Sequence, residues 1–158
     1  MIIPVLMYHS ISDDKSNLSV SVNNFERQIK YLYTSGFRTV QFNNINKKVK
    51  KPLIITFDDG YKDNLINALP ILKKYSFTSI CFVVSDLIGK SNIWDKNNSN
   101  YVFKELLSKN DIKVWLDNGM FIGSHGKSHR SLIELDTDEI IEEIKISKTV
   151  LENIIGNR

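Results

Sequence analysis

The chain has 158 residues, of which 42% are hydrophobic and 25% are charged, and its formal net charge is +3. This is the composition of a globular protein with a hydrophobic core, so we expect a single domain over residues 1–158. The small net charge and the lack of a basic helix with interleaved aromatic residues argue against nucleic acid as a partner. The lysine-rich residues 46–51 are interpreted as a solvated loop.

The sequence predicts neither a membrane span nor an N-terminal signal peptide. No apolar run approaches the roughly 18 residues that a transmembrane helix needs. The apolar residues 1–8 are too few for a signal peptide. We therefore expect the chain as written to be cytoplasmic, or associated with the cell envelope if a signal has been removed from it. The single cysteine, Cys81, lies in an apolar run and is expected to be a buried small side chain.

Strands and helices are predicted to alternate along the chain. The apolar runs indicate strands at residues 2–8, 37–42, 53–57, 77–84 and 120–123. The helical spacing of apolar residues, together with capping residues, predicts helices at about residues 21–35, 62–75 and 110–118, and from Asp136 to the end. Within the second of these helices, Pro70 is expected to cause a kink or a break.

Other features complete this assignment. The last helix carries an apolar stripe of Ile140, Ile144, Leu151 and Ile154. The polar residues 87–100 are predicted to form an irregular surface segment. Strands that alternate with helices form a parallel sheet, either open or closed into a barrel, and five strands are too few to close one.

Polar residues follow three of the predicted strands. His9 follows the first strand, Asp58 and Asp59 follow the third, and His125 and His129 follow the fifth. In α/β folds of either kind, ligands bind at the carboxyl ends of parallel strands. All three histidines of the chain are therefore expected at the same edge of the sheet as the two aspartates.

This combination favours a metal site. Two histidines four residues apart on one side of a helical turn can bind one metal ion, although Asp-Gly alone is a common turn dipeptide. One carboxylate would bind the ion, and the second could act as a general base for water whose pKa the ion lowers. Adjacent strand residues face opposite ways, so both aspartates can line one site only if the backbone turns, which Gly60 permits.

These residues resemble the first two motifs of a known family. "TFDDG" (residues 56–60) and "SHGKSH" (residues 124–129) resemble those of the polysaccharide deacetylases, the NodB-homology carbohydrate esterases of family 4. "PVLMYHSI" (residues 4–11) and "SVNNFERQIKYLYTSGF" (residues 21–37) look like the branch that includes poly-N-acetylglucosamine deacetylases. The resemblance runs over nearly the whole chain.

The resemblance implies a distorted (β/α) barrel with one divalent metal ion, usually zinc, that removes acetyl groups from an N-acetylated polysaccharide or glycoconjugate. Asp58 would then be the catalytic base, and Asp59, His125 and His129 would be the metal ligands. Water activated by the ion would attack the acetamide carbonyl. His9 either lines the sugar site or is a hydrogen-bonded histidine at a strand end.

The resemblance covers only the N-terminal part of the family's pattern. No residues after His129 match the later motifs, which include the Leu-x-His that supplies the general acid. The resemblance therefore implies a barrel that is incomplete at its C-terminus. Trp94, in the irregular segment, is a candidate for stacking on a sugar ring, whereas Trp115 is expected in the core.

Three functions remain open from the sequence. The first is the metal-dependent N-deacetylase. The second is a truncated, inactive carbohydrate-binding remnant of the same fold. The third is an iron site for oxygen chemistry, because two histidines and one carboxylate also bind that metal. The alternation of strands and helices argues against the third function.

Overall fold

A parallel β-sheet forms the centre of the molecule. The computed structural model describes residues 2–42, 45 and 49–156. The sheet has the order β1–β5–β6–β7, and β4 pairs with the start of β5. Its strands are β1 (Val5–Tyr8), β4 (Arg38–Thr39), β5 (Pro52–Phe57), β6 (Ile80–Val83) and β7 (Phe121–Ser124). Every pair in this sheet is parallel, so the carboxyl ends of all five strands point the same way.

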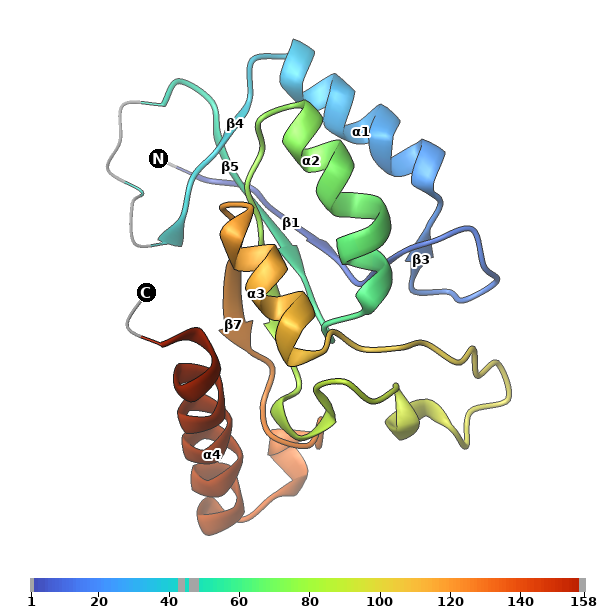
Figure 1. Cartoon of the computed structure of the whole chain (residues 1–158), viewed down its shortest axis with the longest axis vertical. Coiled ribbons are helices and arrows are strands. Elements are labelled where there is room, and N and C mark those ends of the chain that lie inside the picture. Colours follow the sequence, from blue (N-terminus) through green and yellow to red (C-terminus); the bar gives the residue numbers. More distant parts are fainter. Residues whose placement is uncertain (1, 43–44, 46–48, 157–158) are drawn as a thin grey trace.

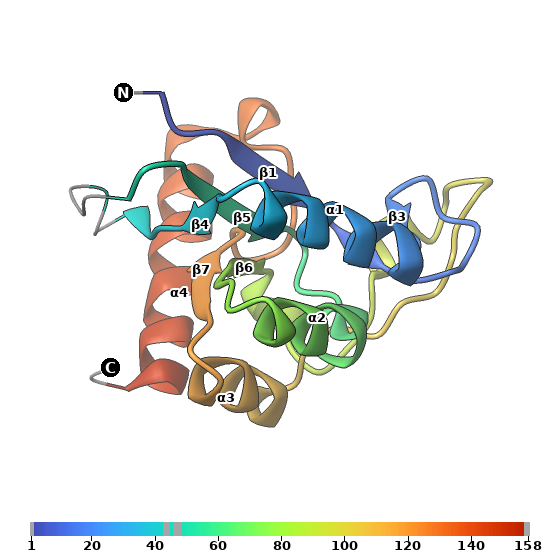
Figure 2. The same ribbon diagram turned by 90° about the horizontal axis from the view of Figure 1, so that it is seen from above.

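The described part of the chain contains four α-helices, which pack beside the sheet. They are α1 (Val22–Thr34), α2 (Leu69–Lys74), α3 (Lys109–Asp117) and α4 (Thr137–Ile155). Figures 1 and 2 show α1, α2 and α3 following one another along one side of the sheet, with α4 beside β7. Within the described residues, no helix combines the length and the hydrophobicity that a membrane crossing requires.

The predicted fold class is confirmed at the level of a parallel α/β sheet. Among the described strands, β1 and β7 lie at the two ends of the strand order, and no pairing joins them. The sheet is therefore open in the described part of the chain, and the barrel stays a prediction. The structure also contains β2 (Ser10–Ile11) and β3 (Ser19–Val20), a short parallel pair that the sequence did not indicate. Of the predicted lysine-rich loop, residues 46–48 lie outside the described residues.

β5 is a central strand, because it pairs with β1, β4 and β6, and all six of its residues are buried. Leu53, Ile55 and Phe57 face the main core, which helices α1, α2 and α3 cover. Ile54 belongs to a separate cluster on the opposite face. Burial on both faces explains why the strand reads as a continuous apolar run. It also brings the chain directly from the core to Asp58.

The predicted helix at residues 62–75 is divided, as Pro70 suggested. A π-helical segment, Asn64–Ala68, precedes α2, and Pro70 lies in the first turn of α2, where its missing N–H is tolerated. The Asn64 side chain is fully buried and donates a hydrogen bond to the carbonyl of His9 at 2.7 Å. The π-helical turn thus fixes the backbone that follows β1.

The predicted stripe on the last helix is wrong in part. α4 begins after an Asp136 capping box as predicted, but its buried residues are Glu143, Ser147 and Leu151. Ile144, which belongs to the predicted apolar stripe, is 53% exposed. The face that α4 turns toward the sheet makes polar contacts, because it packs against the loop after β7 as well as against the core.

A buried lysine connects the β2–β3 region to the segment before α3. The Lys104 ammonium is 2.5 Å from Oδ2 of Asp14 and 3.1 Å from Oδ2 of Asp63, and only 6% of its side chain is exposed. It also donates hydrogen bonds to Ser10 Oγ at 2.7 Å and Ser12 Oγ at 3.1 Å. Burial opposes the charge of Asp14, but the hydrogen bonds from Lys104 and its neighbours outweigh it and lower the pKa of Asp14.

Replacing Lys104 with methionine is expected to lower the free energy of unfolding by about 3 kcal/mol, because two carboxylates lose their buried cation. Asp14 has a lowered pKa, so its stabilising contribution is complete above the unfolded-state pKa near 4 and is lost progressively as the pH falls from there toward the lower folded-state pKa. The difference between wild type and Lys104→Met should therefore shrink below about pH 4.

Urea denaturation at several pH values measures this effect. Lys62→Met is the control, because Lys62 forms only an exposed ion pair with Glu105 and its loss should change little. Equal effects of the two substitutions would contradict the role given to Lys104.

Candidate active site

The two aspartates lie where β5 leaves the core. The Asp58 amide donates a hydrogen bond to the carbonyl of Tyr8 at 2.9 Å, which continues the β1–β5 pairing by one residue. The backbone then turns, since φ is +71° at Asp59 and +77° at Gly60. A Cβ on Gly60 would lie 2.8 Å from Cγ1 of Val83, so glycine is required for space as well as for conformation. The predicted turn is confirmed, and it begins one residue before Gly60.

Asp59 is buried between two imidazoles. Its Oδ1 lies 3.1 Å from Nε2 of His129 and 3.3 Å from Nε2 of His125, and its side chain is 3% exposed. Burial opposes the charge of Asp59, but the hydrogen bonds with both imidazoles outweigh it and hold the pKa well below its ordinary value. The hydrogen bond that Asp59 accepts from His125 raises the pKa of that imidazole.

The histidines come from the segment after β7, which follows β6 at the edge of the sheet. The His125 amide donates to the carbonyl of Val83 at 2.9 Å, so β7 delivers this residue in register with β6. The expected helical turn is wrong, because residues 125–129 form an irregular loop. Gly126 and His129 both have positive φ, at +79° and +66°. This loop conformation, rather than a helical turn, brings the centroids of the two imidazole rings to 5.3 Å from each other.

Backbone strain concentrates at this site. Among the described residues, only three non-glycine residues have a positive φ, namely Asp59, Ser76 and His129. Two of the three belong to the cluster formed by Asp59, His125 and His129. Residues held in this region typically cost about 1–3 kcal/mol each and persist where the surrounding structure enforces them, often at functional sites.

Asp58 lies beside the cluster and is half-buried. Burial raises the pKa of Asp58, and the neighbouring Asp59 raises it further, while His125 and His9 act in the opposite direction. The two adjacent carboxylates therefore differ in character. Asp59 is held ionised between the imidazoles, and Asp58 has an increased proton affinity, as a general base requires.

His9 lies at the same edge of the sheet and is half-buried, as its position after β1 predicted. It is close enough to Asp58 to affect the pKa of that carboxylate. His9 contributes no ligand atom to the Asp59–His125–His129 cluster. Its predicted contact with substrate stays a prediction.

Aromatic residues border the cluster on one side. The Trp94 ring stacks on the His129 ring, with centroids 4.2 Å apart and planes inclined by 20°. Trp94 therefore lies beside the site, although one of its faces is already covered, and its stacking on sugar stays a prediction.

Tyr61 is 1% exposed and donates a hydrogen bond to Asp59. Trp115 is fully buried in the core as expected. Cys81 is buried as well, and burial raises the pKa of its thiol.

The residues present fit a divalent metal ion. One ligand atom from each of Asp59, His125 and His129 lies within 4.8 Å of the other two. Two imidazoles with one carboxylate are a common ligand set for zinc, and a catalytic site with three protein ligands leaves one position for water or substrate. The Nε2 atoms of both histidines face the same carboxylate oxygen, so the three side chains already converge.

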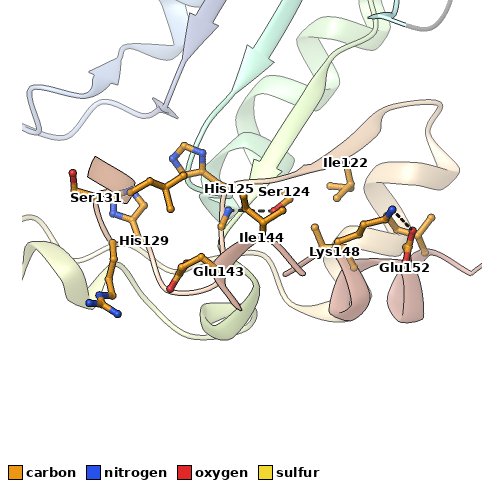
Figure 3. Close-up of a pocket in the computed structure, with 14 residues that line it drawn as sticks. Ile122, Ser124, His125, His129, Ser131, Glu143, Ile144, Lys148 and Glu152 are labelled. Atoms are coloured by element: carbon orange, nitrogen blue, oxygen red, sulfur yellow. Dashed lines mark hydrogen bonds and ion pairs between the residues drawn. The ribbon is translucent and has the colours of Figure 1, made fainter. Parts of the chain in front are cut away.

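A cavity of about 800 Å³ lies beside the histidines. Figure 3 shows His125 and His129 at one end of it and the Lys148–Glu152 pair of α4 at the other. Ile122 of β7 and Ile144 contribute apolar surface to its lining. The candidate metal site is therefore open to a sizeable space along α4.

Sequence reasoning missed one residue of the site, Glu143. This residue lies on α4, is 5% exposed and contacts the loop between the two histidines. An available signal was the spacing of Glu143, Ser147 and Leu151 on one face of the helix, which is the face that the structure buries. The predicted apolar stripe indicated a different face of the helix.

Known proteins resemble this chain in sequence. The family model described as polysaccharide deacetylase matches residues 45–158. YxkH of Bacillus subtilis (strain 168) is 32% identical over 159 residues, which cover 96% of this chain and 52% of YxkH. The poly-β-1,6-N-acetyl-D-glucosamine N-deacetylase of Staphylococcus aureus (strain MSSA476) is 31% identical over 122 residues, covering 73% of this chain and 39% of that protein.

The fold agrees as well. The crystal structure of BC0361, a polysaccharide deacetylase from Bacillus cereus, superimposes with a TM-score of 0.78 at 34% identity, covering 96% of this chain and 47% of that one. The chain spans about half the length of these relatives, or less. The match to the family model covers more than two thirds of the sequence, including both aspartates and both histidines of the site. The chain belongs to the polysaccharide deacetylase family.

Proposed function

We propose that this chain carries the metal site and the catalytic base of a metal-dependent hydrolase, which removes N-acetyl groups from an amino-sugar polysaccharide or glycoconjugate. The observation that carries the proposal is the convergence of Asp59, His125 and His129 beside a second carboxylate with a raised pKa. Family membership supports hydrolysis of the acetamide, because a relative of this chain is named as an N-acetyl-D-glucosamine polymer deacetylase.

Asp59, His125 and His129 would hold one divalent cation, for which zinc is the best match to the ligand set. When bound, such an ion lowers the pKa of water and stabilises negative charge on a carbonyl oxygen. Asp59 contributes a buried negative charge in contact with both imidazoles. Tyr61 contacts Asp59 and Trp94 stacks on His129, so both aromatic residues border the ligand cluster.

Asp58 would act as the base. As water attacks the acetamide carbon, Asp58 accepts one of its protons, and the raised pKa of this carboxylate favours that transfer. The leaving nitrogen takes up a proton as the C–N bond breaks, and in the family's pattern the Leu-x-His motif supplies that proton. The products are acetate and a free amino sugar. The distorted barrel expected from the family would place this site at the carboxyl ends of its strands.

The proposal is tested by incubating the zinc-loaded chain with oligomers of N-acetylglucosamine and measuring both acetate and new primary amine. We expect equal amounts of the two products, with release stopped by a chelator and restored by zinc. Glycan binding that survives both chelation and Asp58→Asn, with no acetate released, would instead support the carbohydrate-binding remnant. Iron-dependent oxygen consumption would support the oxygen-chemistry alternative.

A further inference from the structure

The loop between His125 and His129 is held from two sides. On one side, the amides of Ser85 and Asp86 donate hydrogen bonds to the carbonyls of Gly126 and Lys127, at 3.1 and 2.9 Å. These donors belong to the short helical turn after β6. These two hydrogen bonds fix carbonyl groups of the loop. The amides of Lys127 and Ser128 find their partner elsewhere.

Glu143 of α4 supplies that partner. Its Oε2 accepts hydrogen bonds from the amides of Lys127 at 2.7 Å and Ser128 at 2.9 Å. Its Oε1 accepts a third from the Ser128 hydroxyl. One carboxylate thus holds two successive residues of the three that separate the histidines. Figure 3 shows Glu143 beside this loop.

Glu143 is closely packed between α4 and the loop. Only 5% of the residue is exposed, and Ser147, one turn further along α4, is 2.5 Å from the hydroxyl of Ser124 at the end of β7. A Cβ on Gly126 would lie 3.2 Å from Oε2 of Glu143, so the loop backbone and the carboxylate are closely packed. Hydrogen bonds to an ionised acceptor are also roughly twice as strong as those between neutral groups.

We propose that Glu143 is a positioning residue for the metal site, which holds the 126–128 backbone so that both imidazoles face Asp59. This inference rests on the proposed function, which identifies the group that the imidazoles bind as a divalent metal ion. An irregular loop with positive φ at both Gly126 and His129 has no helix or sheet of its own to maintain it. The contacts from α4, together with those from the turn after β6, therefore hold the loop that carries the two rings.

The experiment compares three substitutions in the whole chain. Glu143→Ala removes all three hydrogen bonds. Glu143→Gln keeps an oxygen that can accept from both amides and an NH₂ group that can donate to the Ser128 hydroxyl. Glu142→Ala is the matched control, because Glu142 is the preceding residue of α4 but pairs only with the Lys127 ammonium, at 2.5 Å, on the surface.

Two measurements are made on each variant. The first is amide hydrogen exchange of residues 125–129 in the metal-free chain, followed by mass spectrometry. The second is Zn²⁺ affinity, measured by competition with a chromophoric chelator, together with the visible spectrum of the Co²⁺ form. Thermal unfolding by circular dichroism reports whether each variant is folded.

We expect Glu143→Ala to exchange about tenfold faster or more in this segment and to bind Zn²⁺ about 10–100-fold more weakly. Its Co²⁺ spectrum should change, because the ligand geometry changes. Glu143→Gln should be closer to wild type than to Glu143→Ala in both measurements, and Glu142→Ala should match wild type. If Glu143→Ala does not fold, Glu143→Asp replaces it, since its carboxylate is one methylene too short to reach both amides.

Equal exchange in the two alanine variants would overturn the proposal. So would faster exchange in Glu143→Ala with unchanged Zn²⁺ affinity, because loop order would then be irrelevant to the ligands. Failure of the proposed function gives a different pattern. Wild type that binds Zn²⁺ but releases no acetate refutes only the deacetylase, and wild type that binds no Zn²⁺ refutes the metal site, while the exchange comparison still decides whether Glu143 orders the loop.

Discussion

Asp58→Asn is expected to reduce kcat for acetate release by about 10²–10⁴-fold, the usual contribution of a general base. Asparagine has the same shape as aspartate but cannot accept the proton that water loses. Asp58 contributes no ligand atom to the metal cluster, so Zn²⁺ affinity should stay close to that of wild type. Separate measurements of kcat and of Zn²⁺ affinity therefore distinguish a base from a ligand.

Asp86→Asn is the control for this substitution. The side chain of Asp86 is exposed on the turn after β6, close to the same edge of the sheet. The Asp86→Asn substitution removes one negative charge near the site and leaves the proposed base unchanged, so we expect little change in kcat. An Asp58→Asn variant that retains full activity would show that another group accepts the proton.

Asp59→Ala is expected to weaken Zn²⁺ binding by more than about 100-fold, because loss of a direct ligand should exceed the 10–100-fold cost of losing an outer partner. His125→Ala and His129→Ala should behave alike, since all three residues supply one atom each to the cluster. Competition with a chromophoric chelator measures these affinities, and acetate release should fall in parallel.

The third histidine provides the control for the ligand set. His9 lies at the same edge of the sheet but outside the cluster, so His9→Ala should bind Zn²⁺ as wild type does. Retained Zn²⁺ binding in Asp59→Ala would contradict the assignment of the carboxylate ligand. Loss of Zn²⁺ binding in His9→Ala at unchanged thermal stability would contradict the assignment of the histidines.

The location of the site could be predicted from the sequence because it follows from the parallel direction of the strands. Parallel strands end at a common edge, so residues directly after β1, β5 and β7 must meet there. This reasoning brought His9, Asp58, Asp59 and the two later histidines together without knowledge of any side-chain contact. The turn at residues 59–60 was likewise readable, because two adjacent carboxylates cannot line one site from a regular strand.

The local form of the histidine loop could not be predicted in the same way. A spacing of four residues is typical of a helical turn, but residues 125–129 are irregular. Their conformation depends on hydrogen bonds with Ser85, Asp86 and Glu143. All three partners are distant in the sequence, and even Glu143 is 15 residues from Ser128. Patterns over a few residues carry no information about such contacts.

The same limit explains the wrong stripe on α4. Periodicity identifies the apolar face of a helix and assumes that this face is buried. In α4, one buried face carries Glu143 and Ser147, because it contacts the backbone of the loop and the end of β7. A buried polar face is expected where a helix supports a functional loop, and only the tertiary contacts reveal it.

The central claim is that Zn²⁺ held by Asp59, His125 and His129 is required for removal of N-acetyl groups. The most direct test is a titration of the metal-free chain with Zn²⁺ while acetate release from N-acetylglucosamine oligomers is followed. We expect release to rise in proportion to added Zn²⁺, to level off at one equivalent per chain, and to be absent in Asp59→Ala. Release that does not depend on Zn²⁺, or one equivalent of bound Zn²⁺ with no acetate formed, would contradict the claim.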